Sequence, residues 1–157
     1  MTQKILVALD DSENAMRAVE FITKIFKPDS RVTLMCVLQD TAALCDMSSP
    51  ELTSYFIAQQ GTFCALEQEK KKLVESAVEN ARALLLKADF FENNISIKVD
   101  MKKTGVAADI LEEFKLGNYD VLVMGRRGLS GIKEFFLGSI SQKVIHGAKD
   151  ISIMLVS

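Results

Sequence analysis

The sequence predicts an α/β protein, in which an open parallel sheet carries helices on both faces. Three short runs of apolar residues, at 4–9, 31–38 and 121–124, are typical of strands that are covered on both sides. Segments with apolar residues at helical spacing separate the runs, and this alternation predicts right-handed crossovers between parallel strands. With 157 residues, the chain is expected to form one domain over residues 1–157.

The composition excludes several classes of protein. Hydrophobic residues make up 48% of the chain and charged residues 25%, as in ordinary globular proteins. A net charge of −2 argues against a nucleic-acid partner, and no apolar run is long enough to span a membrane. Met1 leads directly into a strand, without an apolar leader, so the expected location is cytoplasmic.

The three cysteines, Cys36, Cys45 and Cys64, form no C-x-x-C pair. An odd number of cysteines without metal-site spacing suits a reducing compartment. Cys36 falls in a predicted core strand, whereas Cys45 and Cys64 flank a predicted loop, where a redox role is less favoured than none. A single histidine excludes a site with several histidine ligands.

The first half of the chain begins with the strand at 4–9, and Ser12 or Asp11 can cap the helix that follows. That helix has an apolar stripe from Ala15 to Phe26, and Pro28 lies just beyond it. The second strand is expected at 31–38.

The next segment, 39–63, is predicted to be irregular, with a short helix starting near Ser49-Pro50-Glu51. Such a long loop is either a crossover without a role or a lid or partner surface, and both interpretations stay open. A long amphipathic helix is predicted from Leu66 to Phe91, and the charged run at 67–72 is interpreted as its solvated beginning.

In the second half, alternating residues at 95–101 predict an edge strand, and a helix follows Gly105 and ends near Gly117 and Asn118. A strand is predicted from Tyr119 to Met124. A helix beginning at Ser139 and a last strand at 151–156 complete the chain.

A glycine-rich segment lies between the strand at 121–124 and the helix at Ser139. Gly125, Gly128 and Gly138 have no Cβ, so an anion can approach the main chain closely. The following helix start supplies free N–H groups and a positive dipole end, with Ser139 and Ser141 as hydroxyl donors. Neither G-x-x-x-x-G-K-[ST] nor G-x-G-x-x-G is present, and on these grounds alone a plain turn is as well supported as a phosphate site.

The pattern Gly125-x2-Gly128-x9-Gly138-Ser139 resembles the signature of the ATP-binding branch of the universal stress protein family. The resemblance covers essentially the whole chain and implies a Rossmann-like sheet with strand order 3-2-1-4-5. It implies that the cofactor is ATP or another adenine nucleotide, with Mg²⁺ as a further candidate. It assigns the phosphates to the glycine-rich segment, the ribose or a metal ion to Asp10, and the base to the main chain of Val37 and Met124. The implied nucleotide-binding residues are Asp10, Val37, Met124, Gly125, Arg127, Gly128, Gly138, Ser139, Ile140 and Ser141.

Two positions depart from the family pattern, which often has proline where this chain has Ala107 and at the start of the last strand. Neither departure touches the glycine-rich segment. In the implied strand order, the first and fourth strands are neighbours whose crossovers leave in opposite directions. Asp10 and Gly125 are therefore expected to meet in one crevice at the carboxyl ends of these strands.

The resemblance implies a stress-response module that binds ATP and is a homodimer through its C-terminal strand, with a regulatory protein partner that the sequence does not identify. Two alternatives remain at this point. A slow ATPase is one, although the sequence has neither a dedicated base nor a phosphate-loop lysine. A nucleotide-independent interaction module of the same family is the other.

Overall fold

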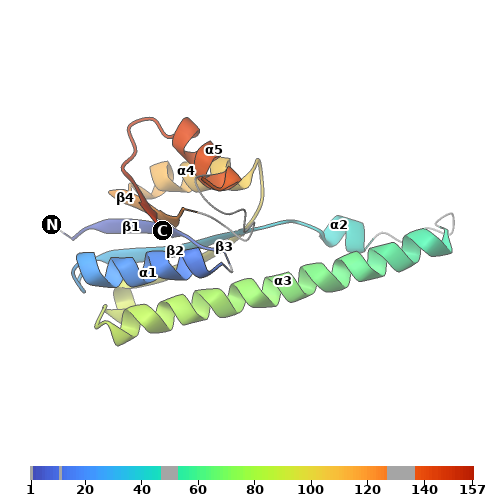
Figure 1. Cartoon of the computed structure of the whole chain (residues 1–157), viewed down its shortest axis with the longest axis horizontal. Coiled ribbons are helices and arrows are strands. Elements are labelled where there is room, and N and C mark those ends of the chain that lie inside the picture. The colour runs from blue at the N-terminus through green and yellow to red at the C-terminus, as the bar shows by residue number, and fades with distance from the viewer. Residues whose placement is uncertain (1, 11, 47–52, 127–136) are drawn as a thin grey trace.

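The computed structural model describes residues 2–10, 12–46, 53–126 and 137–157. Five parallel strands form one sheet in the order β3-β2-β1-β4-β5, which confirms the predicted fold class and strand order. Figure 1 shows helices on both sides of the sheet and one long helix, α3, that runs far past its edge. The strands are β1 (Lys4–Ala8), β2 (Arg31–Leu38), β3 (Ile95–Met101), β4 (Val121–Gly125) and β5 (Ile153–Val156).

The helices cover the two faces in pairs, because side chains alternate between the faces of a strand. Ile5 and Val7 point toward α1 and α3, whereas Leu6 points toward α4 and α5. Each face therefore has its own apolar core. The helices are α1 (Glu13–Ile25), α2 (Ala42–Cys45), α3 (Ser54–Lys87), a short 3₁₀ turn η1 (Glu92–Asn94), α4 (Val106–Gly117) and α5 (Ser139–Gly147).

Local signals set several helix ends as predicted. The Ser12 hydroxyl accepts a hydrogen bond from the Ala15 N–H at 3.2 Å, so Ser12 is the cap of α1. Asn118 ends α4 in the left-handed conformation, with φ of 50°. The predicted start of α5 at Ser139 is also confirmed.

The prediction for residues 39–91 is wrong in two respects. Helix α3 begins at Ser54, twelve residues before the predicted start at Leu66, and it ends at Lys87. A further short helix, α2, occupies 42–45 of the segment that was expected to be irregular. The helix predicted from Ser49 begins in residues 47–52, which lie outside the described part of the chain.

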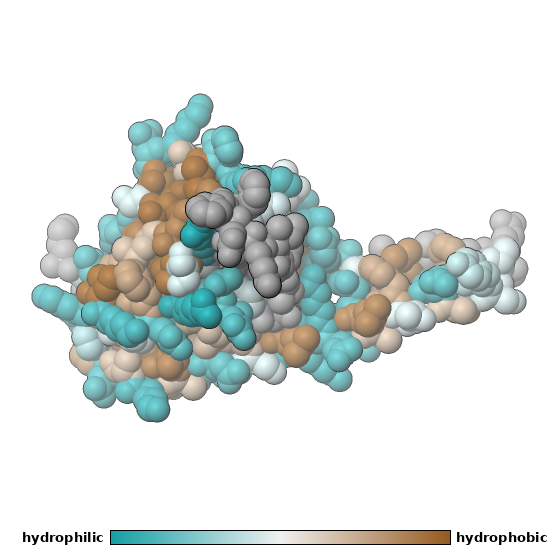
Figure 2. Space-filling view, in the orientation of Figure 1, coloured by the Kyte–Doolittle hydropathy of each residue, from teal (hydrophilic) through white to brown (hydrophobic). Residues whose placement is uncertain are grey.

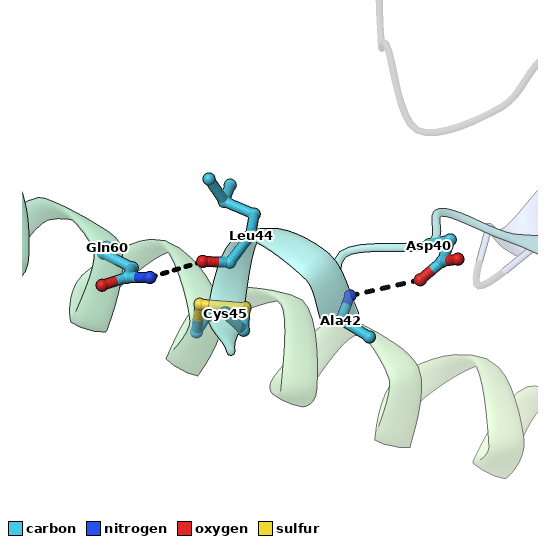
Figure 3. Close-up of a disulfide and its surroundings, with 6 residues drawn as sticks. Asp40, Ala42, Leu44, Cys45 and Gln60 are labelled. Carbon is cyan, nitrogen blue, oxygen red and sulfur yellow. Dashed lines mark hydrogen bonds between the residues drawn. A yellow bond between two sulfur atoms is a disulfide. The ribbon is translucent and has the colours of Figure 1, made fainter. Parts of the chain in front are cut away.

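Helix α3 also brings Cys45 and Cys64 together, and the two form a disulfide between α2 and α3. The disulfide goes against the sequence prediction, which favoured a reducing compartment and considered a redox role for Cys45 and Cys64 less favoured than none. Figure 3 shows the disulfide beside a hydrogen bond from the Gln60 side-chain amide to the Leu44 carbonyl. Nothing in the spacing predicts this pair, because it depends on Cys64 lying on a helix that passes α2. Cys36 is buried in the core, as predicted.

No helix in the described ranges combines the length and apolar character that crossing a membrane requires.

Candidate functional site

A pocket of about 560 Å³ opens where the carboxyl ends of β1, β2 and β4 meet. Its size is within the range of small-molecule sites, about 300–1,000 Å³. Strands β1 and β4 are hydrogen-bonded neighbours, with Ala8 opposite Met124, so Asp10 and Gly125 both reach the pocket. The crevice predicted from the strand order is therefore present.

Asp10 lies two residues beyond β1 and is partly exposed. Its Oδ1 accepts a hydrogen bond from the Ser12 N–H at 2.9 Å, which holds the turn between β1 and α1. One carboxylate oxygen thus has a structural role. A carboxylate has about four acceptor positions, so Asp10 can also accept from a hydroxyl or bind a cation.

Gly125 lies at the end of β4, where α1 passes very close. A Cβ at this position would lie 2.8 Å from the backbone carbonyl of Asn14, so a larger residue would push α1 away. The main chain beyond Gly125 is held from two sides: the Arg126 N–H donates to Val156 at 2.7 Å, and its carbonyl accepts from Gly138 at 3.1 Å. The two ends of the glycine-rich segment are therefore fixed next to each other.

The first turn of α5 enters the pocket through Gly138, Ser139, Ile140 and Ser141. The first N–H groups of a helix have no partner within the helix and form a favourable place for an anion. Ser139 is exposed at the helix start, whereas Ser141 is buried and its hydroxyl donates to the Gly125 carbonyl at 3.2 Å. Of the two serines, Ser139 is therefore the better placed to donate its hydroxyl to a ligand.

The opposite end of the pocket is apolar. Val37 and Met124 come from the central strands, and Met101, Val106 and Ile110 come from β3 and α4. Such a surface suits a flat aromatic group whose polar edge is bound by main-chain atoms.

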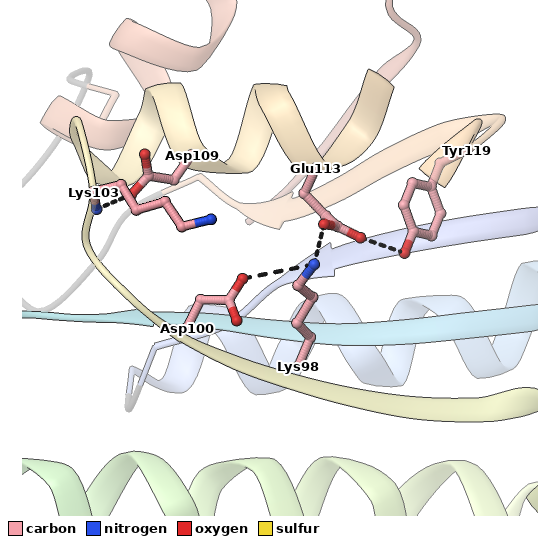
Figure 4. Close-up of polar contacts among 6 residues, drawn as sticks. All are labelled: Lys98, Asp100, Lys103, Asp109, Glu113 and Tyr119. Atoms are coloured by element: carbon pink, nitrogen blue, oxygen red, sulfur yellow. Dashed lines mark hydrogen bonds and ion pairs between the residues drawn. The ribbon is translucent and has the colours of Figure 1, made fainter. Parts of the chain in front are cut away.

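The loop before α4 is fixed by Asp109, whose side chain is only 6% exposed. Its oxygens accept from the N–H groups of Lys103 at 2.8 Å and Thr104 at 3.1 Å. These backbone hydrogen bonds, that of Lys103 above all, hold the pKa of Asp109 below its ordinary value. Figure 4 shows Asp109 at this loop, and farther along α4 the separate group in which Glu113 accepts from Lys98 and from the Tyr119 hydroxyl. Asp109 thus positions α4, and with it Val106 and Ile110.

The third wall of the pocket comes from α3 and was not predicted. Glu67, Gln68, Lys70 and Lys71 line the pocket, although the sequence suggested that this charged run was only a solvated surface. The run itself gives no signal of a site, because its role depends on α3 passing the end of β2.

Eight of the ten predicted nucleotide-binding residues line this one pocket: Asp10, Val37, Met124, Gly125, Gly138, Ser139, Ile140 and Ser141. The other two, Arg127 and Gly128, lie outside the described residues. Within the described ranges, no three histidine, cysteine or carboxylate side chains are grouped as metal ligands. A magnesium ion at Asp10 would therefore take most of its ligands from water and from the phosphates it accompanies.

Sequence comparison identifies the family. The profile of the Universal stress protein family matches residues 1–156. This chain belongs to the universal stress protein family. Among relatives, universal stress protein Sll1388 of Synechocystis is 29% identical, covering 98% of this chain and 96% of the relative. Universal stress protein YxiE of Bacillus subtilis is 28% identical, covering 92% of each protein.

Solved structures agree with the fold of this universal stress protein. UspA from Lactobacillus plantarum has a TM-score of 0.73 at 17% identity, covering 99% of this chain and 97% of that one. Three others are described with nucleotides: a universal stress protein with cAMP (TM-score 0.62), one from Archaeoglobus fulgidus with dAMP (0.60) and one from Arabidopsis thaliana with AMP (0.56). The protein with cAMP is 17% identical to this chain, and the alignment covers 99% of this chain and 96% of that one. The protein with dAMP is 13% identical, with coverages of 100% and 98%. The protein with AMP is 21% identical, with coverages of 98% and 90%.

Proposed function

We propose that this universal stress protein binds an adenine nucleotide, ATP in the first place, in the pocket at the carboxyl ends of β1, β2 and β4. The observation that supports this most directly is the meeting of Asp10, Gly125 and the first turn of α5 in one pocket that also has an apolar end. Relatives whose structures contain cAMP, dAMP and AMP support the choice of an adenine nucleotide.

In this proposal the base lies at the apolar end, against Val106 and Ile110, and bonds to the main chain of Val37 and Met124. The phosphates lie at Gly125, Gly138 and Ser139, where backbone N–H groups favour negative charge. Ser141 acts indirectly, because its hydroxyl already donates to Gly125. Asp10 accepts from the ribose hydroxyls or binds a Mg²⁺ ion that the phosphates carry.

Lys71 adds a positive charge to the same pocket from α3, where the carboxylates of Asp10, Asp40, Asp46 and Glu67 also lie. Its ammonium group attracts a ligand more strongly when that ligand carries more phosphate groups, and a cation bound with the phosphates offsets the carboxylates. In this proposal, Lys71 is the residue of α3 that favours ATP over AMP.

The biological role that follows is a regulatory one, in which the protein signals its nucleotide-bound state to a protein partner in the cytoplasm. The outer edge of β5 has no neighbouring strand in the described sheet and supports the proposed homodimer through that strand. Four carboxylates of the described residues line the pocket: Asp10, Asp40, Asp46 and Glu67. Because the sequence has no phosphate-loop lysine to neutralise the charge that develops during phosphoryl transfer, we expect at most slow hydrolysis.

The test is to identify any nucleotide released on denaturing freshly purified protein, and to titrate ATP, ADP, AMP and cAMP by calorimetry. Gly138→Val places a side chain where the phosphates would lie and should weaken ATP binding by at least about tenfold, or 1.4 kcal/mol. Gly61→Val is the matched control, since a Cβ there meets no atom within 4 Å and Gly61 is remote from the pocket. Lys71→Ala should weaken ATP binding more than AMP binding.

A protein that is empty and ignores millimolar ATP would contradict the proposal and favour an interaction module without nucleotide. If the lysine substitution weakens ATP binding and AMP binding equally, the pocket remains the proposed site, but the proposed preference for ATP over AMP is contradicted. If ATP is hydrolysed, equal rates in Asp10→Ala and the wild type would exclude Asp10 from turnover.

A further inference from the structure

The first twenty residues of α3 form a helix without a core. None of residues 54–73 is buried, whereas the later part of the same helix buries Val74, Val78, Ala81 and Leu85. In Figure 1 this first part, with α2 beside it, extends away from the sheet as an arm. Most of the stability of helices in proteins comes from packing of an apolar face, and this part of α3 has no such packing on the sheet. The arm would therefore gain stability from a partner.

The arm presents large apolar side chains to solvent, and Figure 2 shows hydrophobic surface along it. Four of them, Phe56, Phe63, Leu66 and Leu73, are 38%, 39%, 60% and 52% exposed. Their separations of seven, three and seven residues are those of the a and d positions of a coiled coil. The four side chains form one stripe along the helix. Spacing of this kind is the pattern by which one helix packs against another in a coiled coil.

Helix α2 does not cover this stripe. The disulfide at Cys64 and the hydrogen bond from Gln60 to Leu44 place α2 beside the arm at the b and e positions of the same heptads. Residues 74, 78, 81 and 85, which pack on the sheet, continue the b and e positions. The a and d stripe is thus the neighbouring face. Among the described residues its apolar members, Phe56, Phe63, Leu66 and Leu73, are exposed, and Lys70 lies at the border between the stripe and the pocket.

We propose that this stripe, residues 56–73 of α3, binds the same stripe of a second copy of the chain in antiparallel orientation. The spacing is symmetric: Phe56 and Phe63 are as far apart as Leu66 and Leu73. In an antiparallel pair, Phe56 lies against Leu73 of the second copy and Phe63 lies against Leu66. Each pairing occurs twice, which gives four layers of Phe against Leu along about 26 Å of helix, at 1.5 Å per residue.

Charge determines the orientation. The two remaining core positions are Gln59 and Lys70, and the antiparallel register places them opposite each other, so that the amide oxygen can accept from the ammonium group. A parallel pair in register would place Lys70 against Lys70 within the seam, which is unfavourable. At the flanks, the antiparallel register puts Thr62 near Glu69 and Gln60 near Glu67 of the second copy, so no like charges face each other.

Association is measured by sedimentation of the full chain over a range of concentrations. Leu66→Glu and, separately, Leu73→Glu should reduce the mass at least twofold relative to the wild type at a concentration where the wild type is assembled. Both side chains are largely exposed, so the melting temperature of the diluted protein should not change. Leu116→Glu is the matched control, because Leu116 is 73% exposed but lies on α4. Any dimer formed through β5 raises the mass of all variants alike and does not affect the comparison.

A mixing experiment tests the orientation. Phe63→Glu and Leu66→Lys should each prevent self-association, whereas an equal mixture of the two variants should associate. The reason is that the introduced glutamate of one chain faces the introduced lysine of the other in antiparallel register alone. Retention of the wild-type mass in the Leu66→Glu and Leu73→Glu variants would overturn the proposal and leave the stripe to a different protein. Variants that dissociate without rescue in the mixture would overturn the antiparallel register.

Discussion

The two halves of α3 form one continuous helix, but only the second half packs its side chains into the core of the sheet. Residues 74–87 are held by the sheet, where Val74, Val78, Ala81 and Leu85 join the core with Ile5 and Val7. Residues 54–73 have no buried side chain; of the described residues among them, several line the pocket and Cys64 is bonded to α2. One helix therefore contains a segment that is part of the core and a segment that has no buried side chain.

This difference indicates where the chain can change without losing its structure. A helix that projects from a stable base is oriented by the base, so its surface can vary while its direction is kept. We therefore expect substitutions of buried side chains in the base to lower the free energy of unfolding, and substitutions on the exposed stripe of the arm to change it little. The exposed side chains of the arm instead form the surface that we propose binds another copy of the chain.

The largest effect is expected from the same substitution made in each half of α3. Leu85 is fully buried, and Leu85→Ala should lower the free energy of unfolding by about 2–5 kcal/mol through lost contacts and a cavity. Leu73 is 52% exposed, and in dilute protein Leu73→Ala should change the free energy of unfolding by less than about 0.5 kcal/mol. Urea unfolding followed by circular dichroism measures both. Equal losses would mean that the arm and the base unfold as one unit.

An intermediate effect is expected at Asp109, on the face of the sheet opposite to α3. Asp109→Asn removes one acceptor oxygen from the loop before α4 and should cost about 1–3 kcal/mol at pH 7. The folded state lowers the pKa of Asp109 below its ordinary value of about 3.8, so its contribution is complete above that pH and is lost as the pH falls through the folded-state pKa.

Urea unfolding at pH 7, 5 and 3 checks this dependence. The gap between wild type and Asp109→Asn should be the same at pH 7 and 5 and should narrow at pH 3. The arm is the internal comparison, since Leu73→Ala should show no such pH dependence. A gap that stays constant to pH 3 would mean that the carboxylate charge of Asp109 does not stabilise the loop.

The smallest effect is expected at the helix caps. Ser12 caps α1 within the core region, and Ser12→Ala should cost about 1 kcal/mol of the free energy of unfolding. Thr53 caps α3 at the tip of the arm by accepting from the Phe56 N–H at 3.3 Å. Thr53→Ala should leave the free energy of unfolding unchanged and only speed hydrogen exchange in the first turn of α3. A loss of stability in both variants would contradict the separation of arm from base.

The same division explains which parts of the fold could be predicted from the sequence. The strand at 31–38 was predicted to the residue, because burial on both faces leaves an uninterrupted apolar run. The start of α3 was missed because nothing buries its first half: Phe56 and Phe63 do not continue the stripe that begins at Val74, and Gly61 suggested a break. Thr53 gave no capping box, since Phe56 stands where a glutamate would.

For the candidate site, what could be predicted depended on strand order. Asp10 and Gly125 were expected to meet because neighbouring parallel strands end at one edge of the sheet, and they do line one pocket. Lys70 and Lys71 could not be assigned to it, because a charged run on a helix looks the same whether it faces water or a ligand. The hydrogen bond from the Ser141 hydroxyl to the Gly125 carbonyl could not be predicted either, because it depends on how α5 packs against the end of β4.

The disulfide between Cys45 and Cys64 has a practical consequence for anyone who cuts this chain. A protease that cleaves one bond between these cysteines produces two polypeptides that stay joined through sulfur. On a gel without reducing agent the nicked protein would run near the intact mass of 17.4 kDa, and only the reduced sample would separate into an amino-terminal and a carboxyl-terminal fragment. Comparing the two lanes therefore reports in one step whether the bond is present in the purified protein and whether the segment it encloses is open to attack.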